Sequence, residues 1–541
     1  MRRSNAPPRA IDPGAAAATT TTTKMDSSAL PQLQSLLLSQ IPSSIPKLSR
    51  SSGGGVCVLA AASPALAVFL YLLVASRGWT PPEFAIIIDG GSTGSRIHVF
   101  GYRIGWGGVP QLDLDRTASM KVNPGLSAYA EEPSRAGESL LGLLEFARGM
   151  VPRDRWGETE VRLMATAGLR LVEAGVVERI LESCRKVLKA SRFRFQDQWA
   201  SVISGTDEGI YAWVAANYAL GALGGDPQKT TGILELGGAS AQVTFVTSEH
   251  LPSEFSQVLK LGDGTYNLYS NSFLHLGQNV AYESLHELLS SRHLKSKSLQ
   301  EVIYRDPCSP RGFLHSMRSL KLSAGVRFTA YAVGNFSECR SAALALLQKG
   351  KEKCVYHHCP LGSSFVPKLQ GRFLATENFF YTSKFFGLGP TSFLSDLLLA
   401  GERFCNEDWL KHKKRHHSLD EEELLLYCFS SAYIVALLHD SLGIALDDKR
   451  IDFANEVGGV PLDWALGAFV MQKALNPSVS YSDWITDAIG VTVNPSMVLS
   501  NFIIPAFLAL TAWTILKWKK PHSETMFYWE KWRYVITRVD R

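Results

Sequence analysis

The chain has 541 residues, of which 46% are hydrophobic, 10% aromatic and 19% charged, a globular composition that excludes a disordered or collagen-like protein and leaves room for two domains or more. The net charge of +5 is concentrated at the two ends, since residues 1–55 and 517–541 carry +4 each and the residues between them carry −3. Nucleic-acid binding needs clustered positive charge on the folded domain itself, so we expect no nucleic-acid partner.

The N-terminal segment 1–55 consists largely of alanine, threonine, serine, proline and glycine stretches, which predicts a disordered cytosolic tail. Residues 56–74 then form a run of 19 uncharged residues. As a helix rising ~1.5 Å per residue, the run spans ~28 Å of hydrocarbon, so we predict a transmembrane helix over 56–76. A cleaved signal peptide is the alternative, but no small-x-small cleavage site follows the run.

A second uncharged run of 20 residues, 497–516, ends at a basic cluster and predicts a second transmembrane helix before a cytosolic tail, 517–541. A buried core helix is the alternative. The positive-inside rule places both termini in the cytosol and residues 77–496 in a lumen or outside the cell, with the lipid bilayer as a partner. Spans this short favour the thinner membranes of the Golgi and secretory pathway.

Cysteine usage agrees with an oxidising compartment. Six of the eight cysteines fall in one 121-residue region and are expected to form disulfides, namely Cys308, Cys339, Cys354, Cys359, Cys405 and Cys428. Six cysteines allow 15 pairings, and the sequence does not choose among them. Zinc binding is the alternative for the run 354–359, which contains two histidines, but a small disulfide loop is favoured. The sequon at 335–337 predicts N-glycosylation of Asn335.

Between the spans, strand-like and helix-like patterns alternate. Residues 84–88 are typical of a buried strand, 97–100 of an alternating strand, and 136–149 of a helix, which together predict an α/β body. The strongly basic stretch 411–417 is interpreted as a solvated loop, because Ser418 and Glu421 fit a capping box that opens the next helix.

The most informative local feature is a buried strand that ends at Asp89 and runs into a glycine-rich turn. Glycines let backbone N–H groups converge on an anion, and neighbouring hydroxyls add donors, so the turn is a candidate phosphate site. Its members are Gly91, Ser92, Thr93, Gly94, Ser95 and Arg96. Asp89 is placed to hold a hydrated cation. The turn also fits the G-x-S-x-G pattern of serine hydrolases, but that pattern requires a helix where a strand is expected here.

A second turn of similar chemistry begins 146 residues after Asp89, at Glu235, and again joins two apolar strands. Its candidate phosphate-binding residues are Gly237, Gly238 and Ala239. Either turn alone is weak evidence, because paired glycines beside a strand usually form an ordinary hairpin. Together they predict two hairpins that hold a polyphosphate from opposite sides of a cleft.

With these turns in place, the chain resembles the apyrase family of nucleoside triphosphate diphosphohydrolases, because five blocks occur in the family's order. The blocks are 89–100, 163–170, 203–218, 235–242 and 464–468. The resemblance covers essentially all of 84–475. It implies a two-lobed, actin/Hsp70-like (RNase H-like) α/β fold with a central cleft, in which 84–205 plus 465–490 form the first lobe and 206–464 the second. It also implies hydrolysis of nucleoside tri- and/or diphosphates to the monophosphate and phosphate, with Ca²⁺ or Mg²⁺.

By this resemblance Glu208 is the general base that takes a proton from the attacking water, and no covalent enzyme intermediate forms. Its neighbours in sequence include no cation, so we expect its carboxylate to be unpaired. An ordinary helix glutamate favoured by the helix dipole is the alternative. Ser240 and Gln242 are expected to orient the water, and Thr166 to contact the phosphate.

Asp89 and Glu235 are the expected metal residues, acting through water, but the family usually has Asp where this chain has Glu235. The extra methylene moves the carboxylate by ~1.5 Å. Two alternatives therefore stay open: a nucleotide-binding membrane protein with weak or no turnover, and a phosphotransferase of the same superfamily. Phe380 and Tyr381 are similar to a family segment that stacks on the nucleobase, although core packing explains them equally well. The oligomeric state is not predicted.

Overall fold

The computed structural model describes residues 82–104, 109–261, 264–291, 301–317 and 327–475. The predicted tails, 1–55 and 517–541, and the predicted transmembrane helices, 56–76 and 497–516, lie outside these residues. So does the part 476–490 of the predicted first lobe. The described residues all belong to one compact unit of the chain.

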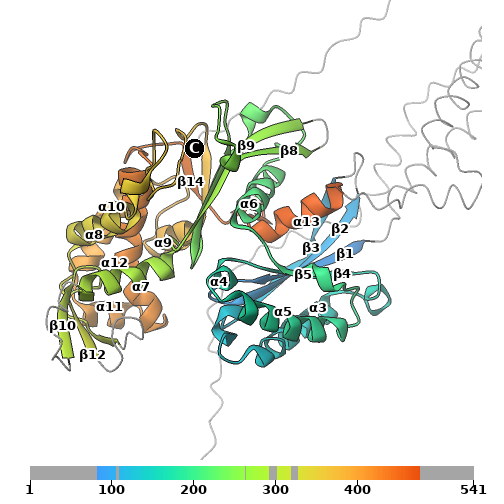
Figure 1. The fold of residues 1–541 in the computed structure, drawn as a ribbon, viewed down its shortest axis with the longest axis horizontal. Helices are drawn as coiled ribbons and strands as arrows, with labels where there is room; N and C mark the ends of the chain where they lie inside the picture. Colours follow the sequence, from blue (N-terminus) through green and yellow to red (C-terminus); the bar gives the residue numbers. More distant parts are fainter. Residues whose placement is uncertain (1–81, 105–108, 262–263, 292–300, 318–326, 476–541) are drawn as a thin grey trace, which may run out of the picture. The chain divides into compact units, whose positions relative to one another are not determined.

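The first sheet has five strands in the order β3-β2-β1-β4-β5 (Figure 1). β1 is antiparallel to β2 and parallel to β4. Of the outer pairs, β2–β3 is antiparallel and β4–β5 is parallel. Because β1 is buried on both faces, its sequence is a continuous apolar run. The elements of this part are β1 Glu83–Gly90, β2 Ser95–Ile104, β3 Pro110–Val122, α3 Leu141–Met150, β4 Glu160–Ala165, α4 Ala167–Arg170, α5 Ala174–Lys189 and β5 Ala200–Val202.

The second sheet has six strands in the order β14-β13-β6-β7-β9-β8 and repeats the topology of the first. Apart from β8, its strands β6, β7, β9, β13 and β14 take the places of β1 to β5, with the same parallel and antiparallel pairs. This duplication agrees with the actin/Hsp70-like topology implied by the sequence, and the α/β class is confirmed. The strands are β6 Gly232–Leu236, β7 Ser240–Val246, β8 Ser256–Leu261, β9 Gly264–Leu274, β13 Phe373–Glu377 and β14 Ile451–Phe453.

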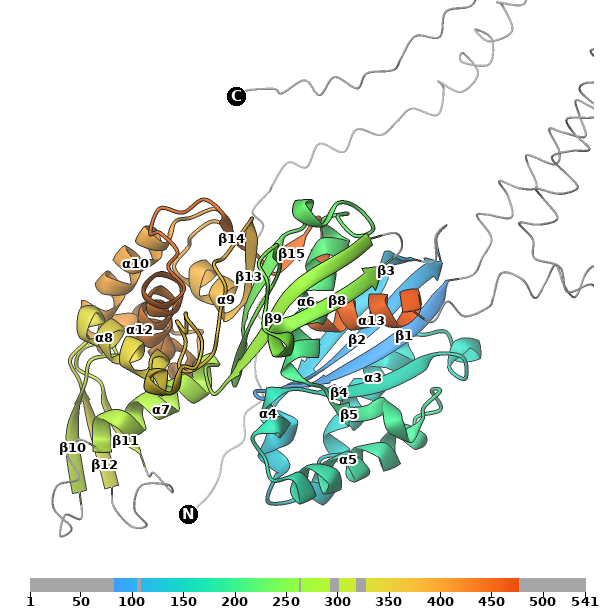
Figure 2. The same ribbon diagram turned by 45° about the horizontal axis from the view of Figure 1, so that its top comes forward.

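Two helices, α6 (Gly205–Ala219) and α13 (Trp464–Leu475), lie between the sheets (Figures 1 and 2). They approach closely, because a Cβ atom at Gly467 would overlap the backbone carbonyl of Tyr211. Their apolar side chains share one core with Ile87 of the first sheet and Ile233 of the second. The sheets therefore pack through a common apolar layer.

The remaining elements pack on the second sheet around a separate apolar core that includes most of α12. They are α7 Gln278–Ser291, β10 Glu301–Asp306, β11 Leu314–Met317, β12 Arg327–Ala332, α8 Phe336–Leu347, α9 Asn378–Phe385, α10 Leu394–Asn406, α11 Trp409–Arg415 and α12 Glu421–Val435. The short strands β15 Glu456–Val457 and β16 Val460–Pro461 instead pack on the core between the sheets, beside α6. One described helix, Glu421–Ser441, is apolar and long enough to cross a membrane, but 78% of its apolar window is buried within the fold.

The six clustered cysteines form three disulfides, Cys308–Cys339, Cys354–Cys359 and Cys405–Cys428. The prediction of a disulfide loop over 354–359 is therefore confirmed and zinc binding there is not. The prediction of a solvated loop over 411–417 is wrong in part, because α11 extends to Arg415. Asp408 caps α11 and Asp420 caps α12, so an aspartate next to each helix replaces the expected Ser418 cap.

Candidate active site

The two glycine turns close hairpins of identical register. In the first hairpin Asp89 pairs with Arg96, and four residues, 91–94, separate the last paired residues. In the second, Glu235 pairs with Gln242, and again four residues, 237–240, form the turn. Asp89 and Glu235 thus occupy equivalent positions, as do Arg96 and Gln242. The first turn is followed by strand β2, which excludes the serine-hydrolase elbow.

The turns of the two hairpins contact each other. A Cβ atom at Gly238 would lie 2.7 Å from Ser92 Oγ and 3.0 Å from Thr93 Cγ2. The segment that contains Thr166 packs on the same first turn, since a Cβ at Gly168 would lie 2.7 Å from the Ser92 Cα and the Thr166 N–H donates to the Gly90 carbonyl at 3.2 Å. A side chain at Gly168 would thus meet the backbone of the first turn, whereas one at Gly238 would meet the side chains of Ser92 and Thr93. Ser95, by contrast, is fully buried behind the turn.

Glu235 is a buried acid and Asp89 a partly buried one, and neither has a full set of hydrogen-bond partners. Among the residues that the structure describes, Asp89 Oδ1 and Glu235 Oε2 accept no hydrogen bond. Burial, followed by the charge of Glu208, raises the pKa of both carboxyl groups well above their usual values. Uncompensated buried carboxylates of this kind are stabilised by a cation.

Glu208 lies in the first turn of α6, whose N-terminus is capped by Ser204. Its side chain is 9% exposed and forms an ion pair with Arg170, which is 16% exposed. The expectation of an unpaired carboxylate is therefore wrong, because the partner comes from α4 and is distant in sequence. Burial raises the pKa of Glu208 to about 7, while Arg170 opposes the shift. A carboxyl group with this pKa is suited to exchange protons near neutrality.

Ser240 and Gln242 lie next to this ion pair. Gln242 Nε2 donates to Ser240 Oγ at 2.7 Å and to Ser272 Oγ at 3.2 Å. Arg170 Nη1 donates to the same Ser272 oxygen at 3.4 Å. A network of hydrogen bonds thus runs from Glu208 to Ser240 through side chains of α4, β9 and β7.

Sequence reasoning missed Glu377, at the end of β13. Its carboxylate interacts electrostatically with Asp89, Glu208 and Glu235, and burial raises its pKa. Its backbone has φ 57° and ψ −121°, which is strained for a residue with a side chain, and its N–H donates to Asn455 Oδ1 at 2.7 Å. Glu377 precedes α9, yet its side chain does not cap that helix. The strained backbone of Glu377 is the feature that marks it as functional, and this strain is visible only in the structure.

Asp463 was also missed. It precedes α13 and lies 3.3 Å from His98 Nδ1, measured from Oδ2. Burial lowers the pKa of His98, and the charge of Asp463 opposes this shift. Asp463 also raises the pKa values of Asp89 and Glu235, behind the larger effects of burial and of other carboxylates. Five carboxylates thus share one region with the two guanidinium groups of Arg96 and Arg170.

The two aromatic candidates lie on α9, one turn from Glu377. The Tyr381 hydroxyl interacts with the side chains of Arg96 and Asn455, and the residue is 41% exposed. The Phe380 ring lies 5.6 Å from that of Tyr381 and 5.5 Å from Lys384 Nζ. Tyr381 therefore borders the carboxylate cluster and is not part of the core.

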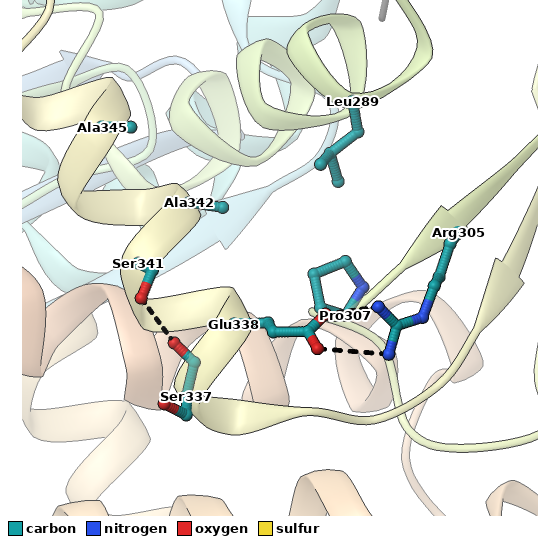
Figure 3. Close-up of a pocket in the computed structure, with 8 residues that line it drawn as sticks. All are labelled: Leu289, Arg305, Pro307, Ser337, Glu338, Ser341, Ala342 and Ala345. Carbon is teal, nitrogen blue, oxygen red and sulfur yellow. Dashed lines mark hydrogen bonds and ion pairs between the residues drawn. The ribbon is translucent and has the colours of Figure 1, made fainter. Parts of the chain in front are cut away.

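A cavity of about 430 Å³ lies elsewhere, between α7, α8 and β10 (Figure 3). Arg305 and Glu338 form an ion pair of 2.7 Å at this cavity. Its lining residues are Leu289, Arg305, Pro307, Ser337, Glu338, Ser341, Ala342 and Ala345. It contains none of the predicted catalytic, phosphate-binding or metal residues, although Asn335, the predicted glycosylation site, caps α8 beside it.

Comparison with known proteins agrees with this geometry. Residues 80–481 match the model of the GDA1/CD39 (nucleoside phosphatase) family. The chain is 54% identical over 473 residues to Probable apyrase 6 of Arabidopsis thaliana, covering 84% of each protein. It is 31% identical over 420 residues to a nucleoside-triphosphatase of Pisum sativum, covering 71% of this chain and 87% of that protein.

The fold also resembles that of a solved structure. A nucleoside triphosphate hydrolase from Neospora caninum superposes with a TM-score of 0.57 at 18% sequence identity, covering 79% of this chain and 99% of that chain. At this identity the similarity bears on the fold alone. Taken with the family match and the plant relatives, it leads to one conclusion: the chain belongs to the GDA1/CD39 (nucleoside phosphatase) family.

Proposed function

We propose that the protein is an apyrase that hydrolyses nucleoside tri- and/or diphosphates to the monophosphate and phosphate. The observation that carries this function is the contact between the two glycine turns beside the buried Glu208. The names of the plant relatives support hydrolysis over the alternatives of binding without turnover and of phosphoryl transfer to another acceptor.

In this function the backbone N–H groups and hydroxyls of the two turns bind the phosphate chain, and Thr166 contributes a further hydroxyl. The phosphate-binding residues are Gly91, Ser92, Thr93, Gly94, Arg96, Gly237, Gly238 and Ala239, with Ser95 buried behind them. Glu208 takes the proton of the attacking water, which Ser240 and Gln242 orient. Tyr381, with Phe380, borders the site where the nucleobase would stack.

The acids fit a divalent cation held through water. Two of their oxygen atoms lack partners, and oxygen ligands suit Ca²⁺ and Mg²⁺. Within the described part of the chain, no three acidic, histidine or cysteine side chains converge to ligate an ion directly, so Asp89 and Glu235 would hold its water molecules. When bound, the cation neutralises charge on the phosphate oxygens.

Arg170 balances the charge of Glu208 in this arrangement. Its guanidinium pairs with that carboxylate across α4 and α6, and α4 directly follows Thr166, in the segment that packs on the first turn. A phosphate that binds there competes with Glu208 for Arg170. Substrate binding would therefore free the carboxylate to accept a proton.

We propose further that the protein is anchored in the membrane by helices 56–76 and 497–516, with both termini cytosolic and the catalytic part in the lumen of the Golgi or secretory pathway. Three disulfides in the described residues support an oxidising compartment. The cysteine-rich part also carries the sequon whose Asn335 we propose as a glycan acceptor.

The test is phosphate release by the full-length protein in detergent. Wild type is offered a panel of nucleoside di- and triphosphates with Ca²⁺, Mg²⁺ or chelator, and no phosphate acceptor. We expect free phosphate only with a divalent cation. Glu208→Gln should lower the rate by about 10²- to 10⁴-fold, whereas Asp207→Asn, the neighbouring acid, should retain most of the activity. Equal rates for wild type and Glu208→Gln would contradict the assignment of the base.

A further inference from the structure

Ser272 lies on β9 directly opposite Gln242 on β7, outside all five of the sequence blocks. Its hydroxyl oxygen accepts two hydrogen bonds, from Gln242 Nε2 at 3.2 Å and from Arg170 Nη1 at 3.4 Å. One side chain therefore contacts both the partner of the proposed base and the residue proposed to orient the water.

The hydrogen bonds of Gln242 determine which end of its amide faces the site. A primary amide nitrogen has two N–H donors, and here Ser240 and Ser272 accept one each. The side-chain oxygen is then the end left to accept a hydrogen bond from the attacking water. Without Ser272, one donor loses its acceptor, and the amide is free to rotate.

Arg170 is held by two partners, Glu208 and Ser272. One terminal nitrogen pairs with Glu208, and the other donates to Ser272. A Cβ atom at Gly205, the first residue of α6, would overlap both Arg170 Nη1 and the Ser272 side chain. Helix α6 therefore begins with a glycine, which leaves room for the contact between Arg170 and Ser272.

We propose that Ser272 is a positioning residue, which holds the Gln242 amide and the Arg170 guanidinium in register so that the attacking water and the Glu208 carboxylate meet. Its hydroxyl acts through these two neighbours and does not itself react. This role rests on the proposed hydrolysis.

Strand β9 supplies a matched control. Ser270 lies on the same face two residues earlier, with its oxygen 2.9 Å from Thr244 Oγ1 and 3.2 Å from the Thr206 carbonyl. Ser270→Ala therefore removes a similar hydroxyl that does not touch Arg170 or Gln242. Ser272→Thr retains the hydroxyl on a strand that tolerates β-branched residues.

The experiment measures nucleotide hydrolysis by the full-length protein in detergent with a divalent cation. We expect Ser272→Ala to lower kcat by about 5- to 20-fold with KM within about twofold of wild type, as for the loss of one or two polar contacts. Ser270→Ala should stay within about twofold of wild type, and Ser272→Thr should recover most of the rate. If Ser272→Ala does not fold, Ser272→Cys, which keeps the volume, takes its place.

A mutant cycle separates positioning from general structure. In a Gln242→Ala background, Ser272→Ala should lower kcat by less than threefold, because one of its targets is gone. The acid limb of the kcat/KM profile of Ser272→Ala should move to higher pH, since Arg170 is held less firmly beside Glu208.

Equal rates for Ser272→Ala and Ser270→Ala, or an undiminished Ser272→Ala effect in the Gln242→Ala background, would overturn this role while leaving the proposed function intact. A wild-type protein that releases no phosphate would instead overturn the proposed function, and with it the role of Ser272.

Discussion

The first and second hairpins have the same register but different side chains at equivalent positions. The first pairs Asp89 with Arg96 and has two hydroxyl residues, Ser92 and Thr93, in its turn, whereas the second pairs Glu235 with Gln242 and has one, Ser240. The first is thus suited to bind charge and the second to orient water at close range. We therefore propose that the two hairpins, which share one register, differ in function because of the side chains at a few paired positions.

The largest expected effect comes from forcing the hairpins apart. Gly238→Val would place methyl groups against Ser92 and Thr93, because even a Cβ lies 2.7 Å from Ser92 Oγ. We expect kcat/KM for nucleotide hydrolysis to fall by about 10²-fold, as for a displacement of ~1 Å in an active site. The control is Gly142→Ala on α3, where no atom lies within 4 Å of an added Cβ. Similar rates for the two variants would show that the contact between the turns is dispensable.

A second comparison concerns the equivalent acids. Asp89→Asn and Glu235→Gln should each raise the Ca²⁺ or Mg²⁺ concentration for half-maximal hydrolysis by about 10- to 100-fold, as for residues that act on a metal through its water. Metal titrations at saturating nucleotide measure this change. If only Asp89→Asn has an effect, Glu235 is not the second metal residue.

The pH dependence should respond in opposite directions to two changes around Glu208, whose pKa is about 7. The base acts deprotonated, so kcat/KM should fall as the pH drops below this value. Arg170→Gln removes a positive neighbour, raises the pKa of Glu208 and should move the acid limb to higher pH. Glu377→Gln removes a negative neighbour and should move it to lower pH.

Profiles of kcat/KM against pH, recorded at saturating metal, measure the shift of the acid limb in Arg170→Gln and in Glu377→Gln. A shift in the same direction for Arg170→Gln and Glu377→Gln would contradict the electrostatic origin of the Glu208 pKa.

The smallest expected effect is on stability. Glu377→Gly removes a side chain from a backbone with φ 57°, and we expect the free energy of unfolding to rise by about 1 kcal/mol while hydrolysis falls. Arg192 has φ 71° and lies away from the carboxylates, so Arg192→Gly should raise the free energy of unfolding by a similar amount and leave the rate of hydrolysis unchanged. Denaturant titrations of both variants check this. A loss of stability in Glu377→Gly would mean that its carboxylate serves the fold.

The sequence predicts those parts of the site that are local. Both hairpins were recognised because a buried strand, an acid and paired glycines are adjacent in the chain, and three disulfides were expected from the cysteine cluster. Glu377 and Ser272 were not predicted, because strand pairing brings them beside Leu236 and Gln242 from distant segments. The Arg170 partner of Glu208 was not predicted either, because it lies on a different helix, 38 residues away in the chain.

The most direct test of the central claim compares binding and turnover in Glu208→Gln. The variant keeps both turns, so nucleotide binding with Ca²⁺ should stay within about threefold of wild type. Phosphate release in a single turnover should be at least about 10²-fold slower, because the water has lost its base. Unchanged phosphate release by a variant that binds nucleotide normally would contradict the account.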